Sequence, residues 1–452
     1  MKLDEGNKKP LMSEGKIIKV GVATLGCKVN QCDSAALTKN LQSAHFTLVP
    51  FNAFADAYII NTCTVTAFAD FQARQLIRRA LRLNPRARII VTGCYAQTQA
   101  QALAAIDGVT YVVGNDQKHQ IPELLANPIH DSQRIFASNI FLQKQFPSTP
   151  TSAIAGRTRA FFKIQDGCNA FCSYCIVPFA RGKSRSLPVS NVLTGTQDFI
   201  RQDFQEIVLT GIHLGHYGHD LQPETDLTRT LETLLSQNPN VRFRLSSIEP
   251  NEISNELLQL FGRHENLCLH LHIPLQSGDD SILKMMKRHY DTAFYRALIE
   301  KVAKTVNDIA IGIDVMVGFP GEGEKEFGHT LKLLEELPVA YLHVFPYSER
   351  PGTAALAIQP KVPEKIKKER AAILRELGVK KKETFSRQFL GKTLPVLVEQ
   401  ARDKKTGLAK GFSHNYLPVL LDKHPASLVN TVVRARIEHY REGKLTGTVV
   451  HE

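Results

Sequence analysis

The segment Ala160–Cys175 (AFFKIQDGCNAFCSYC) decides how the chain is interpreted, because a strand-like apolar run leads into three closely spaced cysteines. Cys168, Cys172 and Cys175 form a C-x3-C-x2-C triplet. Three thiolates in one loop can hold three irons of a cubane iron–sulfur cluster and leave the fourth iron open to a substrate or cofactor. A structural zinc site would need a fourth ligand to close its tetrahedron. The histidines that could provide it lie much later in the chain: His213, His216, His219, His270 and His272. The spacing favours iron–sulfur, with zinc as the alternative.

Strand-like runs recur downstream of this triplet, with helical patterns between them. The predicted strands cover residues 160–164, 206–209, 242–245, 267–273, 309–315 and 340–345. Helical patterns such as 281–287 and 326–337 separate them. Six β/α units predict an α/β fold of the open, partial-barrel type, (β/α)6, whose polar and glycine-rich strand ends form the active face.

Upstream of the triplet, three further cysteines follow predicted strands. Strands at 17–23, 57–61 and 87–92 alternate with helices at 34–43 and 71–83, a pattern that predicts a doubly wound parallel sheet. Cys27, Cys63 and Cys94 each lie within four residues of the carboxyl end of one strand. Because ligands bind at that edge of a parallel sheet, we expect the three thiols to share a ligand. The alternative is that small thiols fill buried positions there.

The other segments differ in texture. Residues 1–16 form a polar tail, and residues 141–157 contain the Pro, Ser and Thr cluster of a linker. A strongly basic helical pattern at 361–382 is expected to be a solvated connecting helix. The β-branched runs 394–399, 416–421 and 428–437 predict a small all-β barrel. The expected domains are therefore 17–140, 158–385 and 386–452.

Composition narrows the class of protein. A length of 452 residues suggests about three domains, and 43% hydrophobic and 22% charged residues are typical of globular proteins. The net charge of +12 favours a polyanionic partner such as nucleic acid. No apolar run approaches the ~20 residues of a membrane span, and no secretory signal precedes the first strand, so we expect a cytoplasmic protein. Eight cysteines are too few for a disulfide framework.

The sequence resembles the radical S-adenosylmethionine (SAM) methylthiotransferase family through blocks spread over nearly its whole length. The triplet with Tyr174 before its last cysteine resembles the radical SAM signature. The blocks that carry the methylthiotransferase resemblance are Lys163–Gly182, Leu25–Gln31, Ile60–Val65, Val91–Ala96, Leu209–His213, Arg244–Glu249, His270–Gly278, Asp314–Glu322, Val344–Ser348 and Pro351–Thr353. Gly411–Tyr416 resembles part of a TRAM domain.

This resemblance implies two 4Fe–4S clusters with different tasks. The ligands Cys168, Cys172 and Cys175 would hold the cluster that cleaves SAM reductively to give a 5′-deoxyadenosyl radical. A second, auxiliary cluster, whose sulfur is methylated by a first SAM, would be held by Cys27, Cys63 and Cys94. The residues implied in SAM binding are Tyr174, Ser247, Glu249, Gln276 and Asp314. No side chain is assigned an acid–base role, because the cofactors carry the chemistry.

The family also implies a substrate and partners. The block Gly26–Asn30 resembles the subgroup that methylthiolates C2 of N6-threonylcarbamoyladenosine 3′ of the anticodon in tRNA. The alternatives are the isopentenyladenosine branch, a ribosomal-protein methylthiotransferase, and a non-catalytic protein that binds zinc and RNA. The implied partners are tRNA and an electron donor such as flavodoxin or ferredoxin, with no membrane. The two open irons are expected to face a common chamber. Cys32 and Cys268 are expected to be bystanders.

Overall fold

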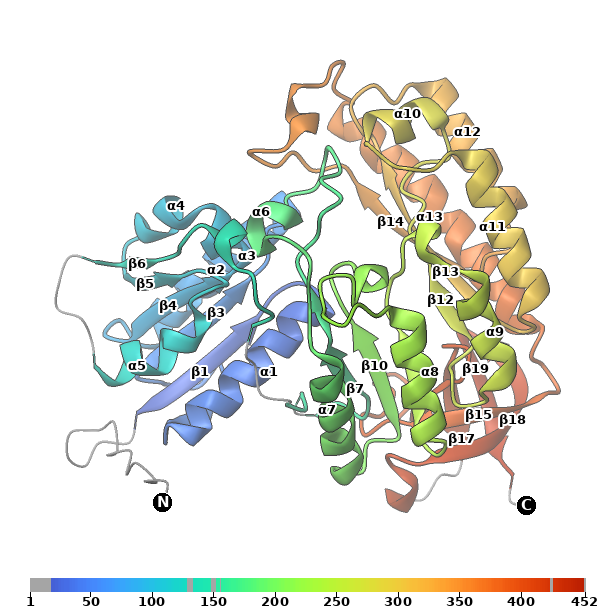
Figure 1. Cartoon of the computed structure of the whole chain (residues 1–452), viewed down its shortest axis with the longest axis horizontal. Coiled ribbons are helices and arrows are strands. Elements are labelled where there is room, and N and C mark those ends of the chain that lie inside the picture. The colour runs from blue at the N-terminus through green and yellow to red at the C-terminus, as the bar shows by residue number, and fades with distance from the viewer. Residues whose placement is uncertain (1–17, 128–132, 148–151, 155, 423–425, 451–452) are drawn as a thin grey trace. The chain divides into compact units, whose positions relative to one another are not determined.

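The computed structural model describes residues 18–127, 133–147, 152–154, 156–422 and 426–450 (Figure 1). The polar tail 1–16, Ile17 of the first predicted strand and positions 148–151 of the predicted linker lie outside the described residues. The chain divides into two compact units. The first comprises Met1–Ser152 with Ile176–Lys183, and the second comprises Ala153–Cys175 with Ser184–Glu452.

The first unit contains the predicted doubly wound sheet, in which six parallel strands have the order β2-β1-β3-β4-β5-β6 (Figure 1). The strands are β1 (Lys19–Thr24), β2 (Thr47–Val49), β3 (Ala57–Thr62), β4 (Arg88–Gly93), β5 (Val109–Val113) and β6 (Ile135–Phe136). The helices are α1 (Lys28–Ser43), α2 (Ala67–Leu83), α3 (Cys94–Thr98), α4 (Ala100–Ala104) and α5 (Ile121–Ala126). α1 and α2 start earlier than predicted, and the sequence reading did not identify β2, β5 and β6.

Both faces of this sheet are covered, because side chains along β3 alternate between two hydrophobic cores. Ile60 packs with α2 residues such as Ile77, and Ile59 packs with α1 residues such as Leu37. The central strand is buried on both sides, as expected for a parallel sheet with helices on each face. Its polar groups therefore gather at the strand ends.

The second unit opens with the predicted partial barrel. Its strands are β7 (Ala160–Lys163), β10 (Glu206–Thr210), β11 (Arg242–Leu245), β12 (His270–His272), β13 (Ala310–Val317) and β14 (Tyr341–Pro346). The ladder β7-β10-β11 and the ladder β12-β13-β14 are parallel, and single bridges from Phe243 to Leu267 and from Ser247 to His272 connect them. Six parallel strands in chain order confirm the partial (β/α)6 architecture.

Helices and short elements follow these strands. They are β8 (Gln165–Asp166), α6 (Val177–Arg181), β9 (Arg185–Ser186), α7 (Val189–Arg201), η3 (Leu214–His216), α8 (Leu227–Gln237), η4 (Pro250–Glu252), α9 (Asn255–Arg263), α10 (Asp280–Met285), α11 (Thr292–Thr305) and α12 (Glu324–Glu336). α6 clusters with the first unit, although it follows the cysteine triplet in sequence. No helix in the described parts of the chain is long and apolar enough to cross a membrane.

The basic helix α13 (Glu364–Arg387) is not simply solvated, which corrects the sequence-based expectation. Lys367 and Arg370 are buried, and Arg370 forms ion pairs with Glu322 at 2.7 Å and Glu324 at 2.9 Å. Two of its cations thus belong to the packing of the partial barrel. Lys381 is half-buried and donates to the carbonyl of Leu337 at 2.7 Å, whereas Lys365, Lys368 and Lys380 are exposed.

The C-terminal strands close the small barrel that the sequence predicted, in the order β15-β16-β17-β19-β18 (red in Figure 1). They are β15 (Thr393–Val398), β16 (Ala409–Ser413), β17 (Pro418–Asp422), β18 (Val432–Arg441) and β19 (Lys444–Val449). Buried Glu206 of β10 accepts hydrogen bonds from Arg242 at 2.5 Å and Arg244 at 2.7 Å. The same arginines donate to backbone carbonyls of the small barrel, so this charge cluster joins the two barrels.

Candidate cluster-binding sites

Three neighbouring strand ends bring the first cysteine trio to one edge of the sheet. β1, β3 and β4 are adjacent, and Cys27, Cys63 and Cys94 follow them by three, one and one residues. Gly26 adopts φ +95°, and a Cβ built there would lie 2.7 Å from Cys63 Cβ and 2.9 Å from its Sγ. The chain before Cys27 therefore approaches Cys63 at a distance that only glycine permits.

A buried asparagine fixes the backbone around this trio. The side-chain amide of Asn30 donates to the carbonyls of Leu25 and Thr62, each at 2.9 Å. Its oxygen accepts from buried Arg181, which also pairs with Asp33 at 2.9 Å. These bonds connect the loop after β1 to the end of β3, so they hold Cys27 and Cys63 in register.

The electrostatics of the trio show that its thiols are crowded. Burial, together with the negative charges that Cys94 and Cys27 would carry, raises the pKa of Cys63 to about 12. A metal held by these thiols would supply the positive charge that favours their deprotonated form. Asn115 donates to Cys94 Sγ at 3.8 Å, which gives that sulfur a polar neighbour as well.

The second trio lies in one loop after β8. Gly167 and Phe171 take positive φ values of +78° and +47°, and the Cys175 amide donates to the Cys172 carbonyl at 3.0 Å. Ser173 ties the loop to a neighbouring segment. Its hydroxyl donates to the carbonyl of Met285 at 2.7 Å, and its backbone amide donates to the carbonyl of Met286 at 3.0 Å. The loop is therefore tightly folded and anchored to the end of α10.

A histidine and an arginine contact the sulfurs of this loop. Nδ1 of His213 lies 3.4 Å from Cys168 Sγ, and Arg288 donates to Cys172 Sγ at 3.3 Å. Burial raises the pKa of Cys172, whereas the charge of Arg288 opposes that rise. The thiolate form of Cys172 is therefore more accessible than it would be if burial acted alone.

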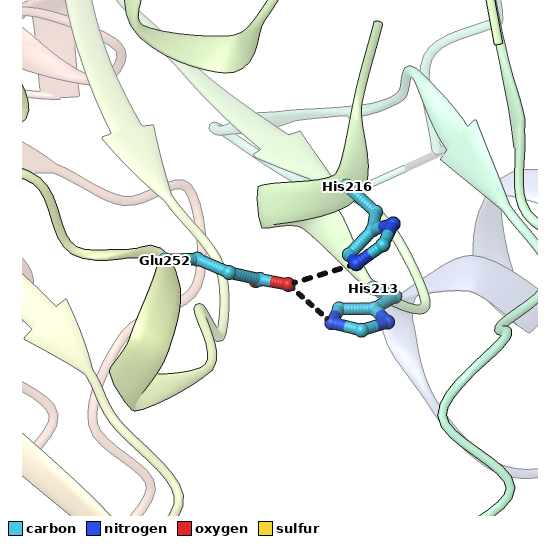
Figure 2. A group of neighbouring side chains, drawn as sticks. All are labelled: His213, His216 and Glu252. Carbon is cyan, nitrogen blue, oxygen red and sulfur yellow. Dashed lines mark ion pairs between the residues drawn. The ribbon is translucent and has the colours of Figure 1, made fainter. Parts of the chain in front are cut away.

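Figure 2 shows Glu252 between two imidazoles: its carboxylate lies 2.6 Å from Nε2 of His213 and 3.5 Å from Nε2 of His216. Burial opposes a charge on His213, but its bonds to Cys168 and Glu252 raise its pKa to about 10. Glu252 comes from η4 and His213 precedes η3, so two loops at the active face orient this ring. His213 therefore contacts Cys168, although 45 positions separate them in the sequence.

A cavity of about 960 Å³ opens beside the loop trio. Its lining includes Cys172, His213, Glu249, Glu252 and Arg288. Its volume suits a ligand of cofactor size. The sequence analysis missed Glu252 and Arg288, because neither lies in a cysteine motif and each reaches the site from another loop.

The five residues implied in SAM binding come from several segments of the second unit, and the backbone amide of Gln276 donates to the carbonyl of Asp314 at 2.9 Å. Glu249 lines the cavity and contacts Arg288. Tyr174 packs on the core formed by Ile282, Met286, Phe319, Tyr347 and Ala355. Gln276 takes φ +70° beside β13, and Ser247 bridges to His272.

Asp314, the fifth of these residues, is engaged by two histidines. Its carboxylate lies 2.9 Å from Nε2 of His272 and 3.3 Å from Nδ1 of His343. Burial would raise the pKa of Asp314, but these hydrogen bonds hold it well below its usual range. Asp314 is therefore ionised and lies on the face of β13 that it shares with His343 of β14.

The cysteine arrangement fits clusters better than zinc. Three thiolates on one tetrahedral zinc would stand about 3.8 Å apart, given Zn–S bonds of ~2.3 Å. Among the residues that the structure describes, the side-chain groups with ligand atoms mutually within 4.8 Å include none with a cysteine. A cubane holds its thiolates on separate irons, so it accepts the wider spacing. Cys268 lies outside both trios and is fully buried, as expected of a bystander.

Comparisons with known proteins agree with this geometry. Residues 19–114 match the family described as Uncharacterized protein family UPF0004, and residues 162–334 match the Radical SAM superfamily. The threonylcarbamoyladenosine tRNA methylthiotransferase MtaB of Bacillus subtilis (strain 168) is 37% identical and covers 96% of this chain and 97% of the relative. The enzyme of that name from Aquifex aeolicus (strain VF5) is 39% identical over 84% and 93%.

A relative with another substrate is also similar. The tRNA-2-methylthio-N(6)-dimethylallyladenosine synthase of Desulfotalea psychrophila is 31% identical over 95% of this chain and 98% of its own length. Among solved structures, the radical SAM methyltransferase TsrM from Kitasatospora setae, with cobalamin and a 4Fe–4S cluster bound, shares the fold. Its TM-score is 0.55 at 14% identity, with 75% of this chain and 77% of that chain covered.

Proposed function

This chain belongs to the radical SAM methylthiotransferase family, and we propose that it methylthiolates C2 of N6-threonylcarbamoyladenosine 3′ of the anticodon in tRNA. The observation that carries the proposal is the pair of cysteine trios, one at three strand ends and one in a single loop. Relatives that bear the threonylcarbamoyladenosine name are 37% and 39% identical, against 31% for the dimethylallyladenosine synthase. This difference favours the threonylcarbamoyl substrate.

The trios divide the work in this proposal. Cys168, Cys172 and Cys175 hold one 4Fe–4S cluster, and a second is held by Cys27, Cys63 and Cys94. When bound, these groups supply the electron that cleaves SAM and the sulfur that is transferred. Arg288 donates to Cys172 Sγ, and Nδ1 of His213 lies 3.4 Å from Cys168 Sγ, so these side chains would orient two sulfur ligands of that cluster.

We assign the cavity to SAM. Glu249 and the neighbouring Arg288 present one acceptor and one donor at its wall, which suits a ligand with an amino group and a carboxylate. Ionised Asp314 offers a second acceptor on the interior strand face. Tyr174, Ser247 and Gln276 complete the proposed SAM contacts.

Each proposed domain has one task. Residues 17–140 hold the auxiliary cluster, residues 158–385 carry out the radical SAM chemistry, and residues 386–452 form a TRAM domain that binds RNA. The partner is tRNA, and the net charge of +12 suits its phosphates. A low-potential donor such as flavodoxin or ferredoxin would supply the electron. We place the reaction in the cytoplasm, because its substrate is mature tRNA.

Nucleoside analysis tests this function. In a strain that lacks the gene, mass spectrometry of digested tRNA should show N6-threonylcarbamoyladenosine without the methylthio group in place of its 2-methylthio form. The native gene should restore the product, and the Cys63→Ala gene should not. Loss of 2-methylthio-isopentenyladenosine instead would assign the chain to the other branch, and unchanged tRNA would remove the proposal.

A further inference from the structure

One exposed face of α2 carries aromatic and cationic side chains that neither cluster uses. The α2 face consists of Phe68, Phe71, Arg78, Arg79 and Arg82. Phe68 is 65% exposed and Phe71 is 47% exposed, and their rings are stacked with centroids 6.3 Å apart at 24°. Two large exposed aromatics side by side cost solvation energy that a folded protein would ordinarily avoid by burial.

The helix is built so that this face stays outward. Ala73, Ile77 and Ala80 pack into the sheet core, which leaves the opposite side of α2 in solvent. Its only carboxylate, Asp70, is buried and accepts a hydrogen bond from Thr64 at 2.7 Å. The negative charge of α2 is thus turned inward and its outward charge is positive.

The arginines continue the line that the phenylalanines begin. Seven residues separate Phe71 from Arg78 and eleven separate it from Arg82, so all three lie within roughly 40° around the helix axis, about 10 and 16 Å along it. Among the described residues, the ion pairs include none with Arg78, Arg79 or Arg82. Each can therefore neutralise an external phosphate without first breaking an internal pair.

We propose that the α2 face binds unpaired nucleotides of an RNA loop, with bases stacked on Phe68 and Phe71 and phosphates bound by the arginines. Exposed aromatics beside a basic track are how proteins hold single strands, since every base has a stackable face. The α2 helix starts four residues after Cys63, so a loop held there lies beside the auxiliary trio. This inference rests on the proposed function, because that function supplies a substrate with an anticodon loop.

Binding of two RNAs to the reconstituted full-length protein tests the inference. The probes are an anticodon stem-loop with threonylcarbamoyladenosine and a fully paired RNA duplex of equal length, each followed by fluorescence anisotropy. Phe68→Ala with Phe71→Ala should weaken stem-loop binding about tenfold and leave duplex binding unchanged. Phe68→Tyr with Phe71→Tyr should restore it, because tyrosine also stacks.

The arginines should behave differently from the aromatics. The double variant Arg78→Gln with Arg82→Gln should weaken the binding of both RNAs. It should also lower the slope of log K against log salt concentration by about one to two. Phe54→Ala is the matched control, because Phe54 is 64% exposed and lies outside α2. Iron content and circular dichroism confirm that each variant is folded.

Several results would overturn the inference. The alanine pair could bind the stem-loop as the native protein does, or Phe54→Ala could cause the same loss. If the pair binds RNA normally but slows cluster reduction by flavodoxin, the α2 face docks a protein instead. Methylthiolation by the native enzyme is assayed on the same stem-loop, so failure of the proposed function is seen separately from failure of this face.

Discussion

The two cysteine trios are assembled by opposite routes. Cys168, Cys172 and Cys175 lie within eight residues, and their loop is shaped locally by positive φ at Gly167 and Phe171. The first trio spans 68 residues and is assembled only when β1, β3 and β4 pair in parallel. A local loop keeps its spacing wherever the chain folds, whereas a trio at three strand ends depends on the whole sheet. This comparison predicts that the trios fail independently and for different reasons.

The largest expected effect is complete loss of one task from a single cysteine. Cys172→Ala should abolish 5′-deoxyadenosine formation, because the cleavage cluster loses a ligand. Cys63→Ala should leave 5′-deoxyadenosine formation measurable and abolish methylthiolation. Both are followed by chromatography of quenched reactions with dithionite, SAM and substrate RNA. Identical behaviour of the two variants with both clusters intact would disprove the division of tasks.

A buried charge tests whether the units lose stability separately. Glu206→Gln removes the partner of Arg242 and Arg244 and should destabilise the second unit by about 3–5 kcal/mol, since two buried cations remain. Unfolding by urea, monitored by circular dichroism, measures the loss. The matched control is Glu232→Gln, whose ion pair with Arg263 is exposed and worth under ~1 kcal/mol. Equal destabilisation by both variants would contradict the buried network.

A glycine tests the close approach in the first trio. Gly26→Ala should lower the free energy of unfolding by more than the ~1–3 kcal/mol of an unfavourable φ, because the added Cβ would lie 2.7 Å from Cys63 Cβ. The variant should also lose the iron of the auxiliary cluster and keep the iron of the loop cluster. In Gly391→Ala, φ is +80° but the added Cβ meets nothing within 4 Å. Iron per chain and urea midpoints compare the pair. Retention of auxiliary iron in Gly26→Ala would show that the approach is not required.

The smallest expected effect is a pH dependence of the second unit. Burial alone would raise the pKa of Glu206, but Arg244 and Arg242 hold it well below its usual range. Because the folded pKa is depressed, this stabilisation is present above the unfolded value of about 4.3 and is lost as pH falls toward the folded pKa. The Tm of the native protein should therefore exceed that of Glu206→Gln by less once the pH falls below about 4. A constant difference would mean that Glu206 acts without its charge.

The contrast between the trios also explains which parts of the fold and of the site could be predicted from the sequence. Continuous apolar, β-branched runs predicted the central strands, and the cysteines that follow such runs were predicted to form the two trios. Short strands such as β2, β6 and β16 were missed, because tertiary pairing rather than local pattern defines a strand of two to five residues. Arg288 and Glu252 were missed because their roles depend on contacts with residues 116 and 39 positions away. Arg370 was read as solvated because a charge run does not reveal that Glu322 is buried beside it.

Iron analysis of two triple variants tests the central claim most directly. One replaces Cys27, Cys63 and Cys94 by alanine, and the other replaces the loop cysteines. After anaerobic reconstitution, Mössbauer spectroscopy should find about eight irons in the native chain and one 4Fe–4S cluster of about four in each variant. Loss of all iron from either variant, or zinc in place of iron, would contradict two independently held clusters.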